Sequence, residues 1–140
     1  MECIFCKITA HEIESKIVYE DDKVMAFLDV NPISAGHTLV IPKIHYENIF
    51  DISPDTLERI ASIAKKLALT YEKALNVKAV NLLNASGKEA QQSIFHFHLH
   101  LIPRKANDKL DLWFHGEQNN DTDLDETFKR IKQASADDSK

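Results

Sequence analysis

The sequence predicts an α+β fold in which an antiparallel sheet of about five strands packs against one long helix and a short C-terminal helix. Short apolar runs predict the strands, an apolar repeat at helical spacing predicts the long helix, and the last strands follow each other without a helix between them. A chain of 140 residues suits a single core. We expect one domain over 1–140, with a patterned core at 3–104 and a variable extension at 105–140.

Five short segments rich in apolar and β-branched residues predict the strands. They cover residues 16–20, 24–28, 37–41, 79–84 and 94–102. The acidic turn Asp21-Asp22 joins the first two, which therefore predict a hairpin. The stretch 31–36, with Asn, Pro, Ser and Gly, predicts a loop that leads into the third strand.

The long helix is predicted to begin at Ser53-Pro54, because serine is a good N-cap and proline suits the first helical position. Apolar residues then recur at spacings of three and four as far as Leu75, with charged residues between them. This pattern predicts an amphipathic helix of about 20 residues with one face on the sheet. We expect a second helix at 125–134 and a frayed tail at 135–140.

Composition and charge exclude several classes of protein. The net charge of -5 argues against a nucleic-acid binder, which needs a basic face to neutralise phosphates. The apolar runs are too short to cross a membrane, and the N-terminus lacks the pattern of a secretory signal. We therefore expect a cytoplasmic protein without a nucleic-acid or membrane partner.

The segment 94–102 alternates strictly between two kinds of side chain. Because side chains two apart share a face of a strand, His96, His98 and His100 are expected on one face. The residues expected on the opposite face, in the core under the helix, are Phe95, Phe97, Leu99 and Leu101.

A row of three histidines suits acid–base, nucleophilic or metal chemistry, because imidazole titrates near neutral pH. A straight strand spreads the three over roughly 13 Å, too far for one zinc ion with bonds near ~2 Å. The spacing favours a nucleophile at the middle position. Attack on phosphorus requires a neutral ring whose other N–H is held by an acceptor, while the flanking rings bind phosphate oxygens and assist the leaving group.

The pattern His-Phe-His-Leu-His-Leu-Ile at 96–102 resembles the signature of the histidine triad (HIT) family, in which histidines alternate with apolar residues. Further landmarks resemble its Hint-type branch in order, over about residues 3–104. They lie at 3–8, 19–22, 26–29, 36–43 and 92–95. The resemblance implies a hydrolase of purine nucleotide derivatives, either a phosphoramidase or a dinucleoside polyphosphate hydrolase. It also implies a homodimer whose sheet continues across two chains, with 79–84 near the interface.

The resemblance assigns a role to individual residues. His98 would be the nucleophile that forms a nucleotidyl-histidine intermediate. The other catalytic residues implied are His100, Ser93 and His37. Asp29 would bind the ribose hydroxyls, although alone it would be read as a turn residue. The remaining nucleotide-binding residues implied are Asn84, which alone would be a strand-end cap, Gln92, and Phe5, Ile8, Phe27 and Leu28, which also fit ordinary core packing.

Two positions lie outside the common pattern. Gln91 stands where the family often has glycine, so a positive φ there would strain the loop or require another loop shape. Trp113 lies in the variable C-terminal stretch and is either a wall of the substrate site or a packing anchor.

The two cysteines, Cys3 and Cys6, allow three interpretations. A thioredoxin-like redox pair would follow a strand, and no strand pattern precedes Cys3; a chance pair is also possible. A zinc site needs two further ligands. The resemblance to bacterial members with this motif, and to galactose-1-phosphate uridylyltransferases, implies His45 and His96. Such a Cys2His2 set would be a closed structural zinc site.

Three functions compete. The first is the hydrolase with a nucleotidyl-histidine intermediate on His98. The second is a purine-nucleotide-binding regulatory module with little turnover, although the histidine row is more than binding requires. The third is a structural zinc protein, which would leave His98, His100 and His37 without a task.

Overall fold

The structure is a computed structural model that describes residues 2–117 and 123–138. It divides into two units, Met1–Leu110 and Asp111–Lys140, which are described separately.

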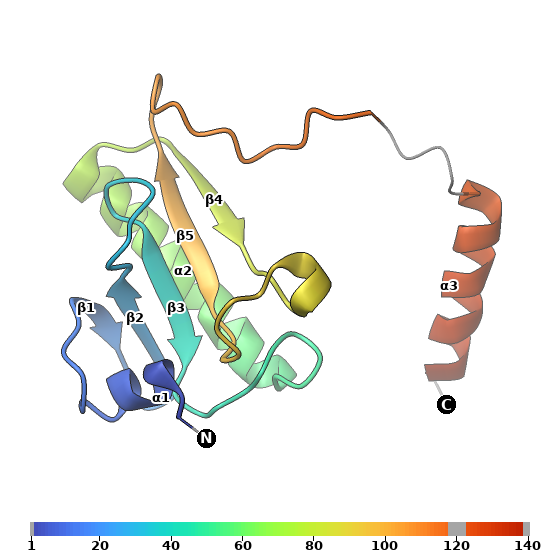
Figure 1. Cartoon of the computed structure of the whole chain (residues 1–140), viewed down its shortest axis with the longest axis horizontal. Coiled ribbons are helices and arrows are strands. Elements are labelled where there is room, and N and C mark those ends of the chain that lie inside the picture. Colours follow the sequence, from blue (N-terminus) through green and yellow to red (C-terminus); the bar gives the residue numbers. More distant parts are fainter. Residues whose placement is uncertain (1, 118–122, 139–140) are drawn as a thin grey trace. The chain divides into compact units, whose positions relative to one another are not determined.

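The first unit is built on one five-stranded sheet (Figure 1). Its strands are β1 (Ile17–Glu20), β2 (Val24–Leu28), β3 (Thr38–Pro42), β4 (Ala79–Leu83) and β5 (Leu99–Arg104). Their order is β1-β2-β3-β5-β4, and every neighbouring pair is antiparallel. The predicted α+β class with an antiparallel sheet is confirmed.

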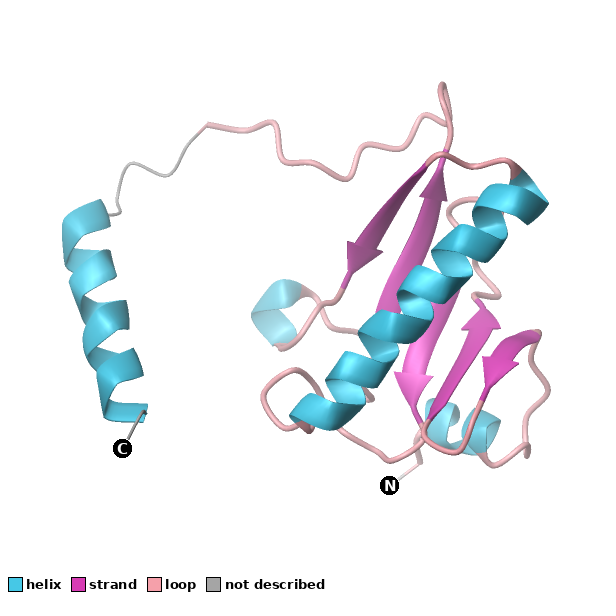
Figure 2. Cartoon of the chain, turned by 180° about the vertical axis from the view of Figure 1, so that it is seen from behind, coloured by secondary structure: helices cyan, strands magenta, loops and turns pink. Residues whose placement is uncertain are grey.

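The long helix α2 (Pro54–Leu75) crosses one face of this sheet (Figure 2). The Ser53 hydroxyl accepts a hydrogen bond from the Thr56 amide at 3.2 Å, and Asn76 ends the helix in a left-handed conformation. These are the capping interactions that satisfy free backbone groups at helix ends. The predicted helix, its N-cap and its length are confirmed.

The central strands β2 and β3 are buried on both faces, because their alternate side chains pack against different helices. Val24, Ala26 and Val40 belong to the core with α2. A second core lies on the opposite face and joins Phe5 and Ile8 to side chains of β2 and β3: Met25, Phe27, Leu39 and Ile41. Phe5 and Ile8 come from a short helix, α1 (Ile4–Thr9), which the sequence did not predict.

The last strand differs from the prediction, because β5 begins at Leu99 and not at residue 94. Its hydrogen bonds explain the difference. The Phe97 amide donates to the Tyr46 carbonyl at 2.7 Å, outside the sheet, and the Gln92 side chain donates to the Ile94 carbonyl at 3.1 Å. The segment before β5 therefore bonds to neighbouring loops and bends away from the ladder.

The bend changes which side chains are buried. Phe97 and Leu101 are buried in the α2 core and Leu99 packs against it, as predicted. The prediction for Phe95 was wrong, because its side chain is 47% exposed. A regular strand would have turned Phe95 to the same face as Phe97, but the residues before Leu99 are not in a strand.

The second unit contains α3 (Leu124–Asp138). The helix predicted at 125–134 is confirmed, but it continues through the first residues of the expected tail; residues 139–140 lie outside the described part of the chain. Leu124, Phe128 and Ile131 are exposed on α3, and Trp113 is exposed before it. The described helices include none that is long and apolar enough to span a membrane.

Candidate active site and metal centre

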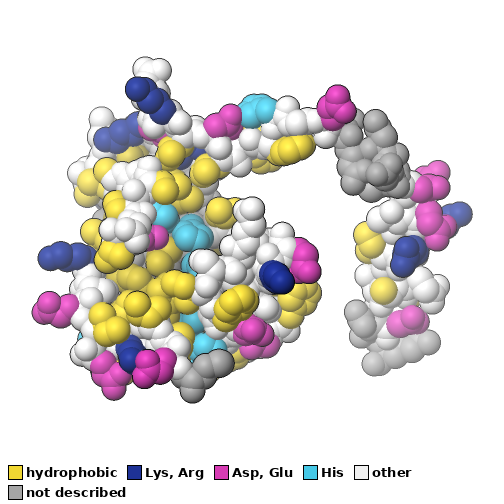
Figure 3. All heavy atoms as spheres, in the orientation of Figure 1, with side chains coloured by type: hydrophobic (Ala, Val, Ile, Leu, Met, Phe, Trp, Pro, Cys, Tyr) yellow, Lys and Arg dark blue, Asp and Glu magenta, His cyan; other side chains and the backbone are white. Residues whose placement is uncertain are grey.

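Histidine side chains are visible among apolar ones on the face of the first unit shown in Figure 3. Only His100 lies within β5, where it pairs with Leu39 of β3 and Leu83 of β4. His98 and His96 lie in the bent segment that precedes the strand, and both are buried. The row therefore exists, but the bend lets each histidine face different partners.

His98 is held in one orientation. Its Nδ1 donates to the His96 carbonyl at 2.8 Å, and its ring packs edge-on against Phe5 with 5.3 Å between ring centroids. A carbonyl only accepts, so the proton lies on Nδ1 and the Nε2 lone pair is available. Burial lowers the pKa of His98, opposed by its backbone hydrogen bond and by Asp29. His98 is thus a neutral ring with one free nitrogen.

His100 and His37 form a second group with Asp29. The His37 Nε2 lies 2.9 Å from His100 Nδ1 and 3.6 Å from the Asp29 carboxylate. The pKa of His100 is lowered to about 4, chiefly by burial and also by His98 and His37, with Asp29 opposing them. Burial also lowers the pKa of His37, opposed by Asp29. Both rings are therefore neutral near pH 7.

Asn84 and Gln92 act on the main chain around His98. The Asn84 amide donates to the His98 carbonyl at 3.0 Å and accepts from the Ser86 hydroxyl. Gln92 is buried, donates to the Glu47 and Ile94 carbonyls and accepts from the Gly87 amide. Each amide thus fixes the loop that delivers His98.

Gln91 has φ +68° and ψ +31°, the left-handed conformation in which glycine would be unstrained. The expected strain at this position is present, and the loop keeps the shape that a glycine would favour. Ser93 is exposed and lines a hollow together with Cys3, Ile4 and Phe95.

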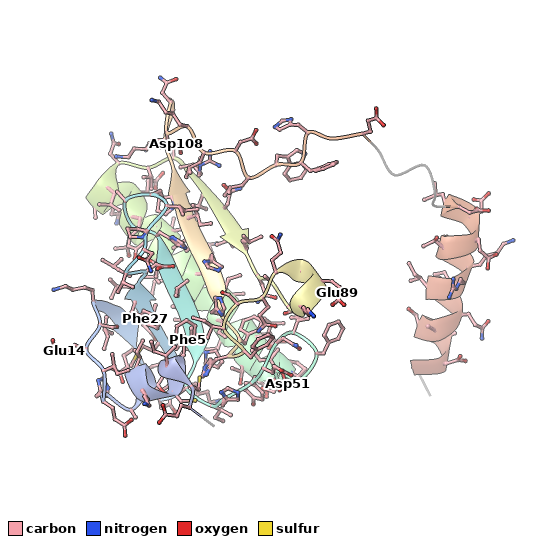
Figure 4. The ribbon with its side chains drawn as sticks, viewed as in Figure 1. Phe5, Glu14, Phe27, Asp51, Glu89 and Asp108 are labelled. Atoms are coloured by element: carbon pink, nitrogen blue, oxygen red, sulfur yellow. The ribbon has the colours of Figure 1, made fainter. Side chains whose placement is uncertain are left out.

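The apolar residues of the predicted base pocket lie beside the row. Phe5 and Phe27 pack edge to face with 5.5 Å between centroids, and Figure 4 shows them together, from α1 and β2. Ile8 is buried with them, whereas Leu28 is partly exposed at the end of β2. Asp29 follows Leu28 and accepts from the Asn31 amide at 2.8 Å, so it also serves as a turn residue.

Cys3, Cys6, His45 and His96 come together at the other end of the row, with their ligand atoms within 4.8 Å of one another. The Cys3 sulfur lies 3.4 Å from His96 Nδ1, and the Cys6 sulfur lies 3.4 Å from His45 Nδ1. The two Nδ1 atoms are 3.2 Å apart. Zinc bond lengths place tetrahedral neighbours about 3.5 Å apart for sulfur and nitrogen and about 3.3 Å for two nitrogens. The donor set fits zinc in both chemistry and spacing.

His96 has its second nitrogen fixed as well. Its Nε2 donates to the Pro42 carbonyl at 2.8 Å, which leaves the Nδ1 lone pair directed at the cysteines. Metal-binding histidines commonly use such a carbonyl to set their tautomer. The backbone groups that orient these rings could not be predicted from the sequence, because every residue carries a carbonyl and almost every residue an amide N–H.

Known proteins resemble this chain over most of its length. The HIT domain family matches residues 10–107. An uncharacterized HIT-like protein of Methanocaldococcus jannaschii is 47% identical over 132 residues, 93% of this chain and 98% of that protein. The crystal structure of a HIT family protein from Bacillus anthracis superposes with a TM-score of 0.86 at 40% identity, covering 99% of this chain and 98% of the other.

Other similar proteins have descriptions that mention an activity or a ligand. An adenylylsulfatase of Arabidopsis thaliana is 40% identical over 78% of this chain and 55% of its own length. A zinc-bound histidine triad family protein of Mycobacterium smegmatis gives a TM-score of 0.76 at 32% identity, covering 100% and 99% of the two chains. A histidine triad nucleotide-binding protein of Candida albicans gives 0.82 at 34%, covering 99% and 98%. By sequence and by fold, this chain belongs to the HIT family.

Proposed function

We propose that this protein hydrolyses purine nucleotide derivatives through a nucleotidyl-histidine intermediate on His98. One observation carries the proposal: His98 is a buried, neutral ring whose Nδ1 proton is held by the His96 carbonyl, so Nε2 has its lone pair free. The adenylylsulfatase and the nucleotide-binding protein among its relatives support a nucleotide substrate.

The reaction has two displacements. The Nε2 of His98 attacks the α-phosphorus, and the bond to the leaving group breaks with its electron pair. The intermediate carries phosphorus on Nε2 and the proton on Nδ1, where the His96 carbonyl stabilises the positive ring. Water then attacks the same phosphorus; the bond to Nε2 breaks, its electron pair returns to the neutral His98 ring, and the nucleotide leaves while one proton of the water passes to solvent. Covalent catalysis of this kind divides one difficult displacement into two easier ones.

The substrate is a phosphoramidate or a dinucleoside polyphosphate, and its nucleoside lies along the α1 side of the row. In this proposal Asp29 accepts from the ribose hydroxyls, Phe5 and Phe27 underlie the base with Ile8 and Leu28, and Asn84 and Ser93 lie around the phosphate and leaving group. Gln92 holds the loop that carries them. Asp29 supports this role because its carboxylate is only partly buried beside the row, 3.6 Å from His37.

We propose that Cys3, Cys6, His45 and His96 hold a structural zinc ion. The ion would supply no chemistry to the reaction; it would join the N-terminal segment and the loop after β3 to the segment that carries His98. The four ligands leave no open position for water. Cysteine ligands of this kind need a reducing compartment, which supports a cytoplasmic location.

We also propose a homodimer in which the sheet continues from β4 to β4 of a second copy. β4 lies at the free edge of the sheet, and its Val80, Leu82 and Leu83 are 37%, 53% and 48% exposed. Leu82→Glu should yield a monomer in analytical ultracentrifugation. Ile17→Glu, on the opposite edge strand, is the matched control and should leave the dimer intact. A wild-type monomer would contradict the proposal.

The hydrolase is tested with an adenosine phosphoramidate that releases a fluorescent amine. We expect turnover by the wild type and its loss in His98→Ala and His98→Asn, both of which should remain folded by circular dichroism. Turnover that survives both substitutions would exclude His98 as the nucleophile. Wild-type binding of AMP without turnover would favour a nucleotide-binding regulatory module.

A further inference from the structure

The loop between β2 and β3 holds His37 in a single orientation. The Ile33 amide donates to His37 Nδ1 at 3.2 Å, the His37 amide donates to the Ser34 carbonyl at 3.1 Å, and the Asp29 amide donates to the His37 carbonyl at 2.9 Å. Gly36 permits this path, because its φ is +92° and a Cβ there would lie 2.7 Å from the Leu75 side chain. Main-chain and side-chain bonds therefore fix the His37 ring together.

The Ile33 amide determines where the protons of two histidines lie. An amide N–H only donates, so His37 Nδ1 must carry a lone pair, and the proton of the neutral ring is on Nε2. That Nε2 faces His100 Nδ1 at 2.9 Å, so His100 Nδ1 must accept. The proton of His100 is then on Nε2. His98 has the opposite arrangement, because its Nδ1 donates to a carbonyl.

We infer that His100 serves the reaction as a neutral hydrogen-bond donor and not as a general acid, and that the Ile33 amide is the positioning group that fixes this role. The inference rests on the proposed function of His98. If neutral His100 gave up its Nε2 proton, it would become an imidazolate, a strong base, and the negative charge of the nearby Asp29 disfavours this second anion.

A cationic His100 is also disfavoured by the geometry. A cationic His100 would carry a proton on Nδ1 as well as on Nε2. That Nδ1 proton would point at the Nε2 proton of His37, and the two nitrogens are only 2.9 Å apart. Moving the His37 proton to Nδ1 would only set it against the Ile33 amide at 3.2 Å. The titratable groups that face His100 are His98, His37 and Asp29, and of these only Asp29 favours a cation. The lowered pKa of His100 agrees with this arrangement.

The atoms balance without a proton from His100. The bond from His98 Nε2 to phosphorus forms while the bond from phosphorus to the leaving group breaks, and the electron pair departs with that group. A departing amine takes a proton from a water molecule as its bond to phosphorus breaks, and the hydroxide formed is neutralised by the proton released when water hydrolyses the intermediate. His100 keeps its Nε2 proton and donates it in a hydrogen bond to the phosphoryl oxygen or the departing atom, where negative charge develops.

The first test reads the tautomers directly by 15N NMR of the full-length protein labelled at histidine, without substrate. We expect His100 to carry its proton on Nε2 and His98 to carry it on Nδ1. Ile33→Pro removes the amide donor and should leave His100 as a mixture of tautomers. The matched control is Ile33→Ala, which keeps the amide and should match the wild type. A proton on His100 Nδ1 in the wild type would overturn the inference, even if the proline variant does not fold.

The second test compares leaving groups. His100→Ala should lower kcat/KM about 100-fold for both an alkylamine phosphoramidate and a nitrophenyl ester of AMP, because both lose the same donor. Loss of a general acid would slow the amine substrate by about 10²- to 10⁴-fold and spare the ester, whose leaving group needs no proton. That unequal loss would overturn the inference. If the wild type cleaves neither substrate, the proposed function fails, whereas the tautomers are still decided by NMR.

Discussion

The two ends of the histidine row bring similar side chains equally close together, yet they suit different chemistry. At one end Cys3, Cys6, His45 and His96 have their ligand atoms within 4.8 Å of each other; at the other, Asp29, His37 and His100 do the same. The Nε2 of His96, the ring nitrogen that faces away from the cysteines, donates to a carbonyl, so Nδ1 keeps a lone pair for a metal. The Nδ1 of His37, which faces away from His100, accepts from an amide. Its Nε2 therefore carries a proton and has no lone pair for a metal. In both groups the backbone partner of one ring nitrogen determines whether the other ring nitrogen keeps a lone pair that a metal could use.

The largest effect should come from removing the metal ligands. Cys3→Ser/Cys6→Ser should abolish zinc binding, measured as about one ion per chain in the wild type by elemental analysis. The free energy of unfolding in urea should fall by about 4 kcal/mol when free zinc is about 1,000 times its dissociation constant. Wild-type protein that is purified without chelator and contains no metal would contradict the assignment.

The two ends would not differ in metal binding if Asp29, His37 and His100 also held an ion. Asp29→Asn/His37→Gln is the matched double substitution, and it should leave the zinc content at the wild-type value, because neither residue is a ligand in our account. The decisive control is zinc titration of Cys3→Ser/Cys6→Ser by calorimetry. A second equivalent in the wild type that persists in the cysteine variant would show that Asp29, His37 and His100 bind metal too.

The group of Asp29, His37 and His100 should make the free energy of unfolding depend on pH. The pKa of His100 is lowered to about 4 in the folded protein, against about 6.5 in the unfolded chain. Between these values only the unfolded state takes up the proton, so stability is lost as pH falls from 7.5 to 4, by about 3 kcal/mol from His100. Urea unfolding of the wild type and of His100→Asn measures this difference. If the free energy of unfolding changed equally with pH in the wild type and in His100→Asn, this expectation would be wrong.

The smallest effect concerns Gln91, which lies in the loop before the row and belongs to neither end. Gln91→Gly should raise the free energy of unfolding by about 1 kcal/mol, because glycine adopts φ +68° without strain. Glu89→Gly, within the short 3-10 helix Lys88–Ala90, is the control and should not stabilise the protein. If both substitutions act alike, Gln91 is not strained.

The elements with strong local patterns could be predicted from the sequence. Helix α2 has its N-cap, its apolar repeat and its end, and the strands have their short runs of apolar and β-branched residues. The short helix α1 could not be found in this way, because six residues give too little periodicity to identify a helix. The start of β5 was also misplaced. Its alternation is perfect, yet the Phe97 amide bonds to the distant Tyr46 carbonyl, and no local pattern reports such a contact.

The candidate site was predictable in its residue types but not in its orientations. The three alternating histidines and the two cysteines mark the site, and the structure brings them together in the groups described above. What separates the tasks of His96, His98 and His100 is a set of backbone groups, among them the Pro42 carbonyl and the Ile33 amide. Every residue has such groups, so only the folded chain reveals which of them face the imidazoles.

The most direct test of the central claim is to trap the covalent intermediate. Wild-type protein is mixed with excess adenosine phosphoramidate, quenched in alkaline denaturant to preserve a phosphorus–nitrogen bond, digested and examined by mass spectrometry. We expect a nucleotidyl group on His98 in the peptide that spans residues 94–104, and none in His98→Asn. A nucleotidyl group on His100, or none on any histidine under conditions of rapid turnover, would contradict it.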